Sequence, residues 1–447
     1  MNGDKKASVT QGSDRAPVAE RSSLGAEHES LPSASSRPLP ASPWTSSPWV
    51  VVAGLFTVLM VSSGFGFYNH SVYMASLAQS HGWALATLSG AVSLFFIVSG
   101  ATGMAVARLI DRFDVRYTMA VGALVSGLAL VLLGRADTVV QVYAAFALFG
   151  AGYSAVSLVP STTLVARWFT QNRSVALSVT STGLSAGGML LTPLSVWLIG
   201  RLGFSQALLW FGCMFCVVVL PVIFLTVRPW PPGRQPERAL GAALPASVDG
   251  VEYRVAVRGR YFGFVTATFV LLMLAQVGGI AHLFSLGLER VGAAAAGTAV
   301  SVLAVCSITG RLLGGVLITR LPMRAFTLAN IVGQAGGLLL LSQATSTTSL
   351  WVGAAVFGLT VGNLLMLQPL LLADAFGLRS YSRIFAASQG LTTLGVAAGP
   401  AAVGALHDLT GGYQYALWAV AAISLFATAV FLLTGSAGPR KPLEVRL

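Results

Sequence analysis

A single arginine, Arg311, stands inside an otherwise apolar stretch of the sequence. Residues 301–321 read SVLAVCSITGRLLGGVLITRL, and this stretch contains no aspartate or glutamate that could neutralise the charge. A charge at membrane depth costs at least ~2.5 kcal/mol on insertion scales, so such a residue usually faces a cavity and marks a pathway. A guanidinium offers a fork of donors that matches a carboxylate. Arg311 is therefore the first candidate for a site that binds an organic anion.

Five other polar side chains lie in or at the ends of apolar stretches and are candidates to bind a substrate. They are Tyr68, Asn69, Tyr153, His282 and Asn363. An imidazole at depth could take up a proton or donate a hydrogen bond to a substrate, and His282 is the candidate for this role. Each of these side chains could instead bond to a neighbouring helix and hold the fold together.

Other kinds of chemistry find no support in the sequence. The cysteines Cys213, Cys216 and Cys306 all lie in apolar stretches, without the second pair or the histidines that a metal site needs. A phosphate-binding glycine-rich loop ending in lysine is also missing, which argues against ATP-driven work. We therefore expect no metal, no cofactor and no enzymatic activity.

The composition indicates a protein embedded in a lipid bilayer. Of the 447 residues, 55% are hydrophobic and only 9% are charged, whereas soluble domains carry about 25% charged residues. The net charge of +12 comes from basic residues in short loops between apolar stretches. That pattern is typical of membrane topology, so we expect no nucleic-acid partner.

Twelve apolar stretches have the length of a membrane-spanning helix, about 20 residues. Helices are expected because backbone groups cannot remain unpaired in lipid. The stretches are 49–75, 85–107, 117–135, 139–164, 174–200, 205–227, 261–287, 295–318, 325–343, 349–373, 384–404 and 414–434. The sequence thus predicts an all-α membrane protein with two six-helix halves, 48–227 and 261–434. A Pro- and Gly-containing cytoplasmic loop, 228–260, joins them, and cytoplasmic tails cover 1–47 (expected to be disordered) and 435–447.

Arginines in the loops predict the orientation. With the N-terminus inside, the cytoplasmic loops carry fifteen arginines, whereas the opposite loops carry only Arg135, Arg201 and Arg290. Positive loops face the cytoplasm, so both termini are expected there. We expect the protein to lie in the plasma membrane.

The two halves also repeat one another. Leu109-Ile-Asp111-Arg112 with Arg116 corresponds to Leu317-Ile-Thr319-Arg320 with Arg324, at an offset of 319 − 111 = 208. Pro193 and Pro400 correspond at an offset of 400 − 193 = 207. Parallel six-helix repeats are the architecture of one large class of carriers, in which the substrate site lies near the membrane midplane between the halves.

At this point the sequence resembles the major facilitator superfamily. The signature loop of that family, G-x-L-x-D-R-x-G-R-R, is represented here by residues 107–116, ARLIDRFDVR. Ala107 and Asp114 replace the usual glycines. The resemblance implies that Asp111, with Arg112 and Arg116, holds one conformation closed by engaging the start of the eleventh helix. Arg320 and Arg324 belong to the second copy, in which Thr319 replaces the acid.

Within that superfamily the sequence resembles the branch of the monocarboxylate transporters and oxalate/formate antiporters. The resemblance rests on ARWFTQNRSVALSVTSTGLSAGG (166–188), on the Gly-Arg within the eighth stretch, and on GPAAVGALHDLTGGYQYALW (399–418). It implies that Arg311 binds a substrate carboxylate. Several monocarboxylate carriers have an aspartate one turn earlier, where this chain has Ser307, so an Asp–Arg pair in this helix cannot couple protons here.

These observations predict a secondary transporter that moves small organic anions, mono- or dicarboxylates, by alternating access, and the resemblance implies a monomer. A coupled proton, through His282, or a counter-anion remains open as the driving partner. The first alternative is a carrier or exporter of neutral or drug-like solutes with the same fold, although a hydrophobic-cation exporter should have an acid inside a span, and none occurs. The second alternative is a membrane sensor or scaffold that transports nothing.

Overall fold

The computed structural model describes residues 47–169, 173–229, 250–318, 320–377 and 380–435. The predicted tails, apart from residue 47 and residue 435, and most of the predicted central loop lie outside these ranges. All that follows concerns the described residues.

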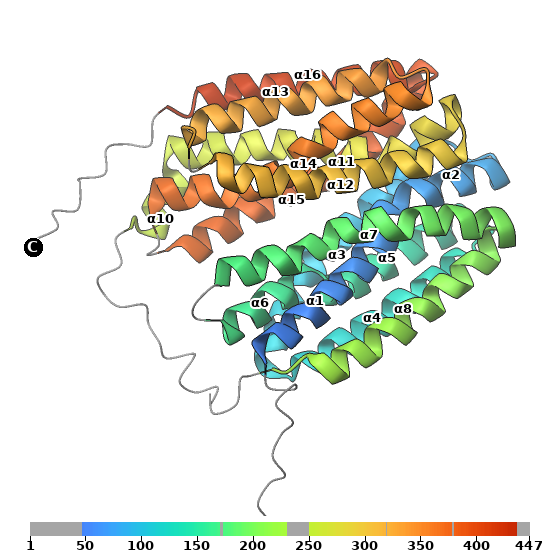
Figure 1. Cartoon of the computed structure of the whole chain (residues 1–447), viewed down its shortest axis with the longest axis horizontal. Coiled ribbons are helices and arrows are strands. Elements are labelled where there is room, and N and C mark those ends of the chain that lie inside the picture. Colours follow the sequence, from blue (N-terminus) through green and yellow to red (C-terminus); the bar gives the residue numbers. More distant parts are fainter. Residues whose placement is uncertain (1–46, 170–172, 230–249, 319, 378–379, 436–447) are drawn as a thin grey trace, which may run out of the picture. The chain divides into compact units, whose positions relative to one another are not determined.

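Most of the described chain is helical (Figure 1). In the first half they are α1 (Pro48–Ser63), the π-helix η1 (Gly64–Tyr68), α2 (His70–His81), α3 (Leu85–Arg112), α4 (Val115–Leu133), α5 (Val139–Ala155), α6 (Leu158–Trp168), α7 (Arg173–Leu202) and α8 (Phe204–Thr226). In the second half they are α10 (Tyr253–Arg258), α11 (Arg260–Arg290), α12 (Ala293–Leu317), α13 (Met323–Ser342), α14 (Thr347–Phe376), α15 (Tyr381–Thr410) and α16 (Tyr413–Leu432). The all-α prediction is confirmed.

Eleven segments of the described chain are long and apolar enough to cross a membrane. They coincide with eleven of the twelve predicted stretches. The remaining stretch, 384–404, forms the middle of α15, which has 30 residues but carries polar side chains such as Gln389, Thr392 and Thr393. Its length and its packing between α3, α11 and α16 give it the place of the twelfth helix.

Two of the predicted spans are interrupted, which the apolar pattern did not indicate. The first span changes to a π-helix over Gly64–Tyr68 before it continues as α2. The fourth span is divided between α5 and α6 at Val156 and Ser157. Pro160 explains the second break, because a proline has no N–H to donate and its ring would clash with the carbonyl of Val156 in a continuous helix. In the central loop, α10 is a further helix that the sequence did not predict.

Close glycine contacts repeat between the halves. A Cβ at Gly150 would overlap the carbonyl oxygen of Phe95, and a Cβ at Gly358 would overlap that of Leu303. Both pairs are related by the same offset, 358 − 150 = 303 − 95 = 208. The N-terminal capping boxes at Thr138 and Ser346 share this offset, 346 − 138 = 208. The structure thus places the same packing at corresponding points of each half, as the sequence repeat predicted.

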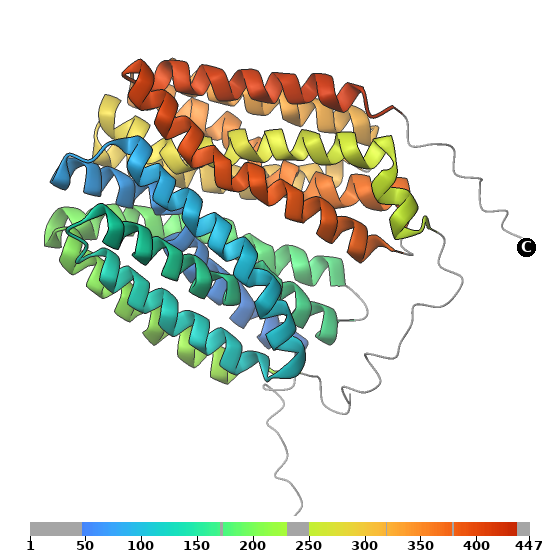
Figure 2. The ribbon, with the colours of Figure 1, turned by 180° about the vertical axis from the view of Figure 1, so that it is seen from behind.

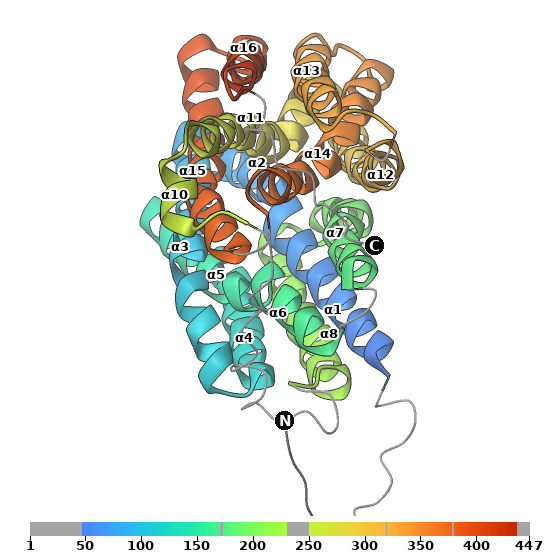
Figure 3. The same cartoon turned by 90° about the vertical axis from the view of Figure 1, so that its left-hand side faces the viewer.

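The two halves meet along two pairs of helices, α3 with α15 and α7 with α12, and α2 also packs against α11. Figure 2 shows α3 and α15 running side by side, and Figure 3 shows the halves end-on. We call the side on which α1 begins and α16 ends the terminal side, and the other the far side. The beginnings of α3 and the ends of α11 and α15 lie on the far side.

Candidate functional site

Arg311 lies on α12 and reaches across to the other half. Its Nη1 donates to the carbonyl oxygen of Ser181 at 3.2 Å and to the Ser181 Oγ at 3.3 Å, both on α7. The side chain is only partly exposed. Among the ion pairs between described residues, none involves Arg311. The Nε and Nη2 donors of Arg311 have no hydrogen-bond acceptor within the described part of the chain, so a partly buried positive charge keeps donors available at the contact between the halves.

The position of Arg311 is fixed by tight packing of α12 against α14. A Cβ at Gly310 would overlap the carbonyl oxygen of Leu359, and a Cβ at Gly362 would overlap that of Ser307. Only glycine allows two helix backbones to approach so closely. The depth and direction of the guanidinium therefore depend on these two contacts.

Tyr68 lies near Arg311, with Tyr153 beside it, and both tyrosines come from the first half. The Tyr68 hydroxyl interacts with the Ser185 side chain and lies close to the Arg311 guanidinium. The Tyr153 ring packs over Gly66 of the π-helix and lies close to Tyr68. The π-helix thus carries Tyr68 to this point, in keeping with the frequent occurrence of π-bulges at functional sites.

Three serines complete this cluster, and sequence reasoning missed them as site residues. Besides Ser181, they are Ser185 on α7 and Ser307 on α12, whose hydroxyl oxygens lie 3.5 Å apart across the two halves. Serines recur along α7, so no pattern in one sequence distinguishes Ser181 and Ser185, and Ser307 stood out only as the position of an aspartate in several monocarboxylate carriers. Only the pairing of α7 with α12 brings them to Arg311.

Asn363 is buried between α14 and α12. Its Nδ2 donates to the carbonyl oxygen of Leu359 at 3.1 Å, and its amide group fills the space beside Gly314, three residues after Arg311. Its Oδ1 has no hydrogen-bond partner among the described residues. Asn363 therefore borders the helix that carries Arg311, although it makes no direct contact with the guanidinium.

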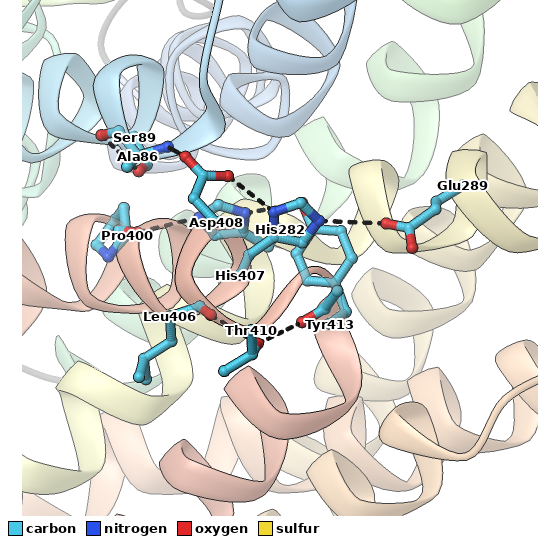
Figure 4. A network of polar contacts seen from close by, with 11 residues as sticks. Ala86, Ser89, His282, Glu289, Pro400, Leu406, His407, Asp408, Thr410 and Tyr413 are labelled. Atoms are coloured by element: carbon cyan, nitrogen blue, oxygen red, sulfur yellow. Dashed lines mark hydrogen bonds and ion pairs between the residues drawn. The ribbon is translucent and has the colours of Figure 1, made fainter.

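His282 lies away from this cluster, and Asn69, which follows Tyr68 in the chain, has a partner elsewhere on α7. The His282 Nδ1 is 3.1 Å from the Tyr413 hydroxyl, and its Nε2 is 3.0 Å from the carbonyl oxygen of Pro400 (Figure 4). Because a carbonyl can only accept, Nε2 carries the proton and Nδ1 accepts from the tyrosine. The Asn69 Nδ2 donates to the Ser195 hydroxyl at 2.6 Å.

Counting residues along α11 and α12 shows that His282 and Arg311 lie at different depths. His282 is 290 − 282 = 8 residues from the far-side end of α11, whereas Arg311 is 311 − 293 = 18 residues from the far-side start of α12. The difference of ten residues corresponds to about 15 Å along the helix axes.

The signature loop between α3 and α4 contains an ion pair. Arg116 contacts the carboxylate of Asp114 at 2.6 Å, and Asp114 also caps α4 by accepting from the Arg116 backbone N–H at 2.9 Å. Asp114, which replaces a glycine of the family signature, thus forms an ion pair with Arg116, an arginine that is expected to act in gating. The Asp111 side chain lies outside the described residues. Arg112 and Arg320 are exposed, and Arg324 donates to the Leu432 carbonyl oxygen at 3.4 Å.

Replacing Asp114 with alanine is expected to lower the stability of the carrier at neutral pH by about 1 kcal/mol, the usual cost of losing an N-cap. Burial raises the pKa of the Asp114 carboxyl, but the hydrogen bonds and charge of Arg116 outweigh it and hold that pKa below its ordinary value. A depressed pKa means that the stabilisation is present at neutral pH and is lost as the pH falls through the folded-state pKa. Thermal unfolding of both proteins as a function of pH measures this. A gap in melting temperature that stays constant down to about pH 3 would contradict it.

The fold and the cluster define a class before any relative is considered. Two repeated six-helix halves that meet around a charged, partly buried cluster are the features of a secondary transporter. The sequence matches the Major Facilitator Superfamily over residues 56–377 and 290–446. The chain belongs to that superfamily, and it is a multi-pass membrane transporter rather than an enzyme.

Individual relatives agree with this assignment. An MFS-type transporter of Gibberella moniliformis is 26% identical over 392 residues, covering 86% of this chain and 88% of that protein. Monocarboxylate transporter 11 of Mus musculus is 25% identical over 409 residues, covering 87% and 86%. The crystal structure of a bacterial homologue of the human lysosomal transporter Spinster has a TM-score of 0.68 at 13% identity, covering 88% of this chain and 97% of that chain. The predicted resemblance to the monocarboxylate transporter branch is confirmed by such relatives.

Proposed function

We propose that this transporter moves small organic anions, mono- or dicarboxylates, and that Arg311 binds their carboxylate group. The observation that carries the proposal is the Arg311 contact across the halves, with donors left over and no acidic partner among the described residues. A carboxylate accepts two parallel hydrogen bonds from a guanidinium, which is the strongest polar contact available there.

The geometry suggests how binding would couple to movement. Arg311 belongs to the second half, whereas Tyr68 and Ser181 belong to the first. An anion held between the guanidinium and the Tyr68 hydroxyl would contact both halves at once. A ligand shifts a conformational equilibrium only if it binds the two states differently, and a site built from both halves satisfies this condition.

Relatives and charge placement favour carboxylates over neutral or drug-like solutes. A protein named a monocarboxylate transporter covers most of this chain at 25% identity, although transporters of fungi with unstated substrates match equally well. An exporter of hydrophobic cations should have an acid inside a span, and the predicted spans contain none. We further propose that both termini are cytoplasmic, that the plasma membrane is the site of action and that the carrier is monomeric.

A carboxylate site at Arg311 can also be tested at Ser307. Ser307→Asp places a carboxylate one turn from Arg311, on the same face of α12. We expect uptake of an acid to fall about tenfold at neutral pH, because the new charge competes with substrate, and to recover when the pH is lowered and the new group is protonated. Ser307→Asn, which adds similar bulk without charge, is the control. Uptake by Ser307→Asp that has the pH profile of the control would contradict a carboxylate site at Arg311.

The proposal itself is tested with substrates. Purified transporter in liposomes is given a panel of labelled mono- and dicarboxylates and, for each acid, its uncharged amide. The proposal predicts saturable uptake of at least one acid and at least a hundredfold less uptake of its amide, because the amide cannot form a charged pair with Arg311. Uptake of neutral compounds in preference to acids would favour the alternative carrier.

A further inference from the structure

The two halves are joined on the far side by a carboxylate that caps a helix of the other half. The Oδ2 of Asp408, near the end of α15, accepts from the Ala86 backbone N–H in the first turn of α3 at 2.7 Å. The residue before α3, Ala84, has no side chain that could cap this helix. The first N–H groups of a helix have no partner within the helix, and its N-terminus carries a partial positive charge. Asp408 supplies both the missing acceptor and the matching charge.

A polar network holds the Asp408 carboxylate in place (Figure 4). The Nδ1 of His407 is 2.9 Å from the Asp408 Oδ1, and its Nε2 is 3.4 Å from the Glu289 Oε2 on α11. The His407 ring packs on Tyr413, with ring centres 4.3 Å apart. With one oxygen facing His407, Asp408 presents the other to α3.

The surrounding contacts show that the halves are tightly packed at this level. Ser93 on α3 accepts from the Ala401 backbone N–H at 3.1 Å. A Cβ at Gly404 would overlap the Ser89 hydroxyl, and the Ser285 hydroxyl donates to the Ser71 carbonyl oxygen at 3.3 Å. By contrast, Met104 and Leu109, in the terminal-side part of α3, are exposed by 63% and 41%. Among the described residues, the hydrogen bonds between α3 and α15 involve Ala86 and Ser93, both in the far-side part of α3.

We propose that Asp408 is a far-side gate latch: its contact with the N-terminus of α3 stabilises the conformation in which the far side is closed, and the contact breaks when that side opens. His407 is a positioning residue for this latch. When the halves separate, the Asp408 carboxylate loses its N–H donor and the α3 N-terminus faces water without a matching charge. The proposal rests on the transporter class alone and holds whatever the substrate is.

The test is a distance measurement between the far-side ends of α5 and α14. Spin labels are attached at Val140, which is 78% exposed, and at Thr348, which is also exposed. The background replaces Cys213, Cys216 and Cys306 with alanine, and the protein is held in lipid nanodiscs. Pulsed electron–electron double resonance then gives the populations of the short and long distances between the two labels.

We expect Asp408→Ala to raise the ratio of long to short distance roughly fivefold, the range of a charge at a helix terminus. Ala86→Pro removes the N–H donor and keeps Asp408, in the first turn where proline is tolerated, and should give a similar shift. The double variant should add nothing further. The control is Asp137→Ala, an exposed acid in the far-side loop before α5, which should leave the ratio unchanged.

Two results would overturn the latch. One is an Asp408→Ala protein with a wild-type melting temperature and a wild-type distance distribution. The other is a shift in Asp408→Ala that Ala86→Pro does not reproduce, or that the double variant doubles, because the two groups would then act independently. If Asp408→Ala does not fold, the Ala86→Pro protein alone decides: an unchanged ratio contradicts the proposal.

Discussion

Replacing Arg311 with glutamine is expected to reduce carboxylate uptake at least a hundredfold, because the guanidinium can make two charged hydrogen bonds to a carboxylate, each worth about 1.5–3 kcal/mol, and the described part of the cluster holds no second cation. Glutamine is polar but two bonds shorter, so it gives up the contacts that Arg311 makes with the Ser181 oxygens at 3.2 and 3.3 Å. Other contacts between α12 and α7, such as that of the Ser301 hydroxyl with the Met189 carbonyl oxygen at 3.0 Å, should keep the two helices packed. Arg311→Lys should retain part of the activity, since it keeps the charge but not the fork of donors.

The measurement is initial uptake in liposomes, with binding measured separately by quenching of tryptophan fluorescence. Arg201→Gln serves as the control, because Arg201 is exposed at the end of α7. Loss of uptake in Arg311→Gln with wild-type melting and wild-type Arg201→Gln activity is the expected outcome. If Arg311→Gln unfolds at a much lower temperature than wild type, the arginine holds the helices together and its role is structural.

Replacing Gly362 with alanine is expected to destabilise the transporter by about 1–3 kcal/mol and to weaken substrate binding together with stability. The added Cβ would overlap the carbonyl oxygen of Ser307 and lie 3.1 Å from the Cβ of Arg311. A backbone oxygen cannot rotate away as a flexible side chain can. Since α14 must then move away from α12, Arg311 shifts relative to α7.

Thermal unfolding in detergent and substrate affinity test this result. Gly315→Ala is the matched control, because Gly315 lies on α12 close to Arg311 and a Cβ there would meet nothing within 4 Å. Alanine is the better helix former by about 1 kcal/mol, so the control should be neutral or slightly stabilised. Equal behaviour of the two variants would show that the α12–α14 contact does not position the site.

The helices could be predicted well because each one follows from a local stretch of apolar residues, and because the pattern of the first half recurs in the second. Apolar length indicates each span, and correspondences such as Pro193 with Pro400 indicate the two halves. The capping boxes at Thr138 and Ser346 lie where two of the predicted spans begin. The interruption at Val156 was missed because the stretch remains apolar on both sides of it, although Pro160 carries the signal.

The candidate site was only partly predictable. Arg311 could be identified because its charge is out of place in an apolar helix, and this reasoning needs no knowledge of its neighbours. Ser181 and Ser185 could not, because a serine in a membrane helix carries no cost that requires an explanation. The role of Asp408 could not be predicted from the sequence, since its partner is a backbone N–H that lies 322 residues away in the chain.

The most direct test of the central claim combines a change in the substrate with a change in the protein. Uptake of one labelled acid and of its amide is measured with wild-type transporter and with Arg311→Gln, under identical gradients. The account predicts that wild type takes up the acid at least a hundredfold faster than the amide. In Arg311→Gln, acid uptake should fall to the level of amide uptake, while amide uptake stays unchanged. A variant that still prefers the acid as strongly as wild type would contradict the assignment of Arg311 as the group that binds the carboxylate.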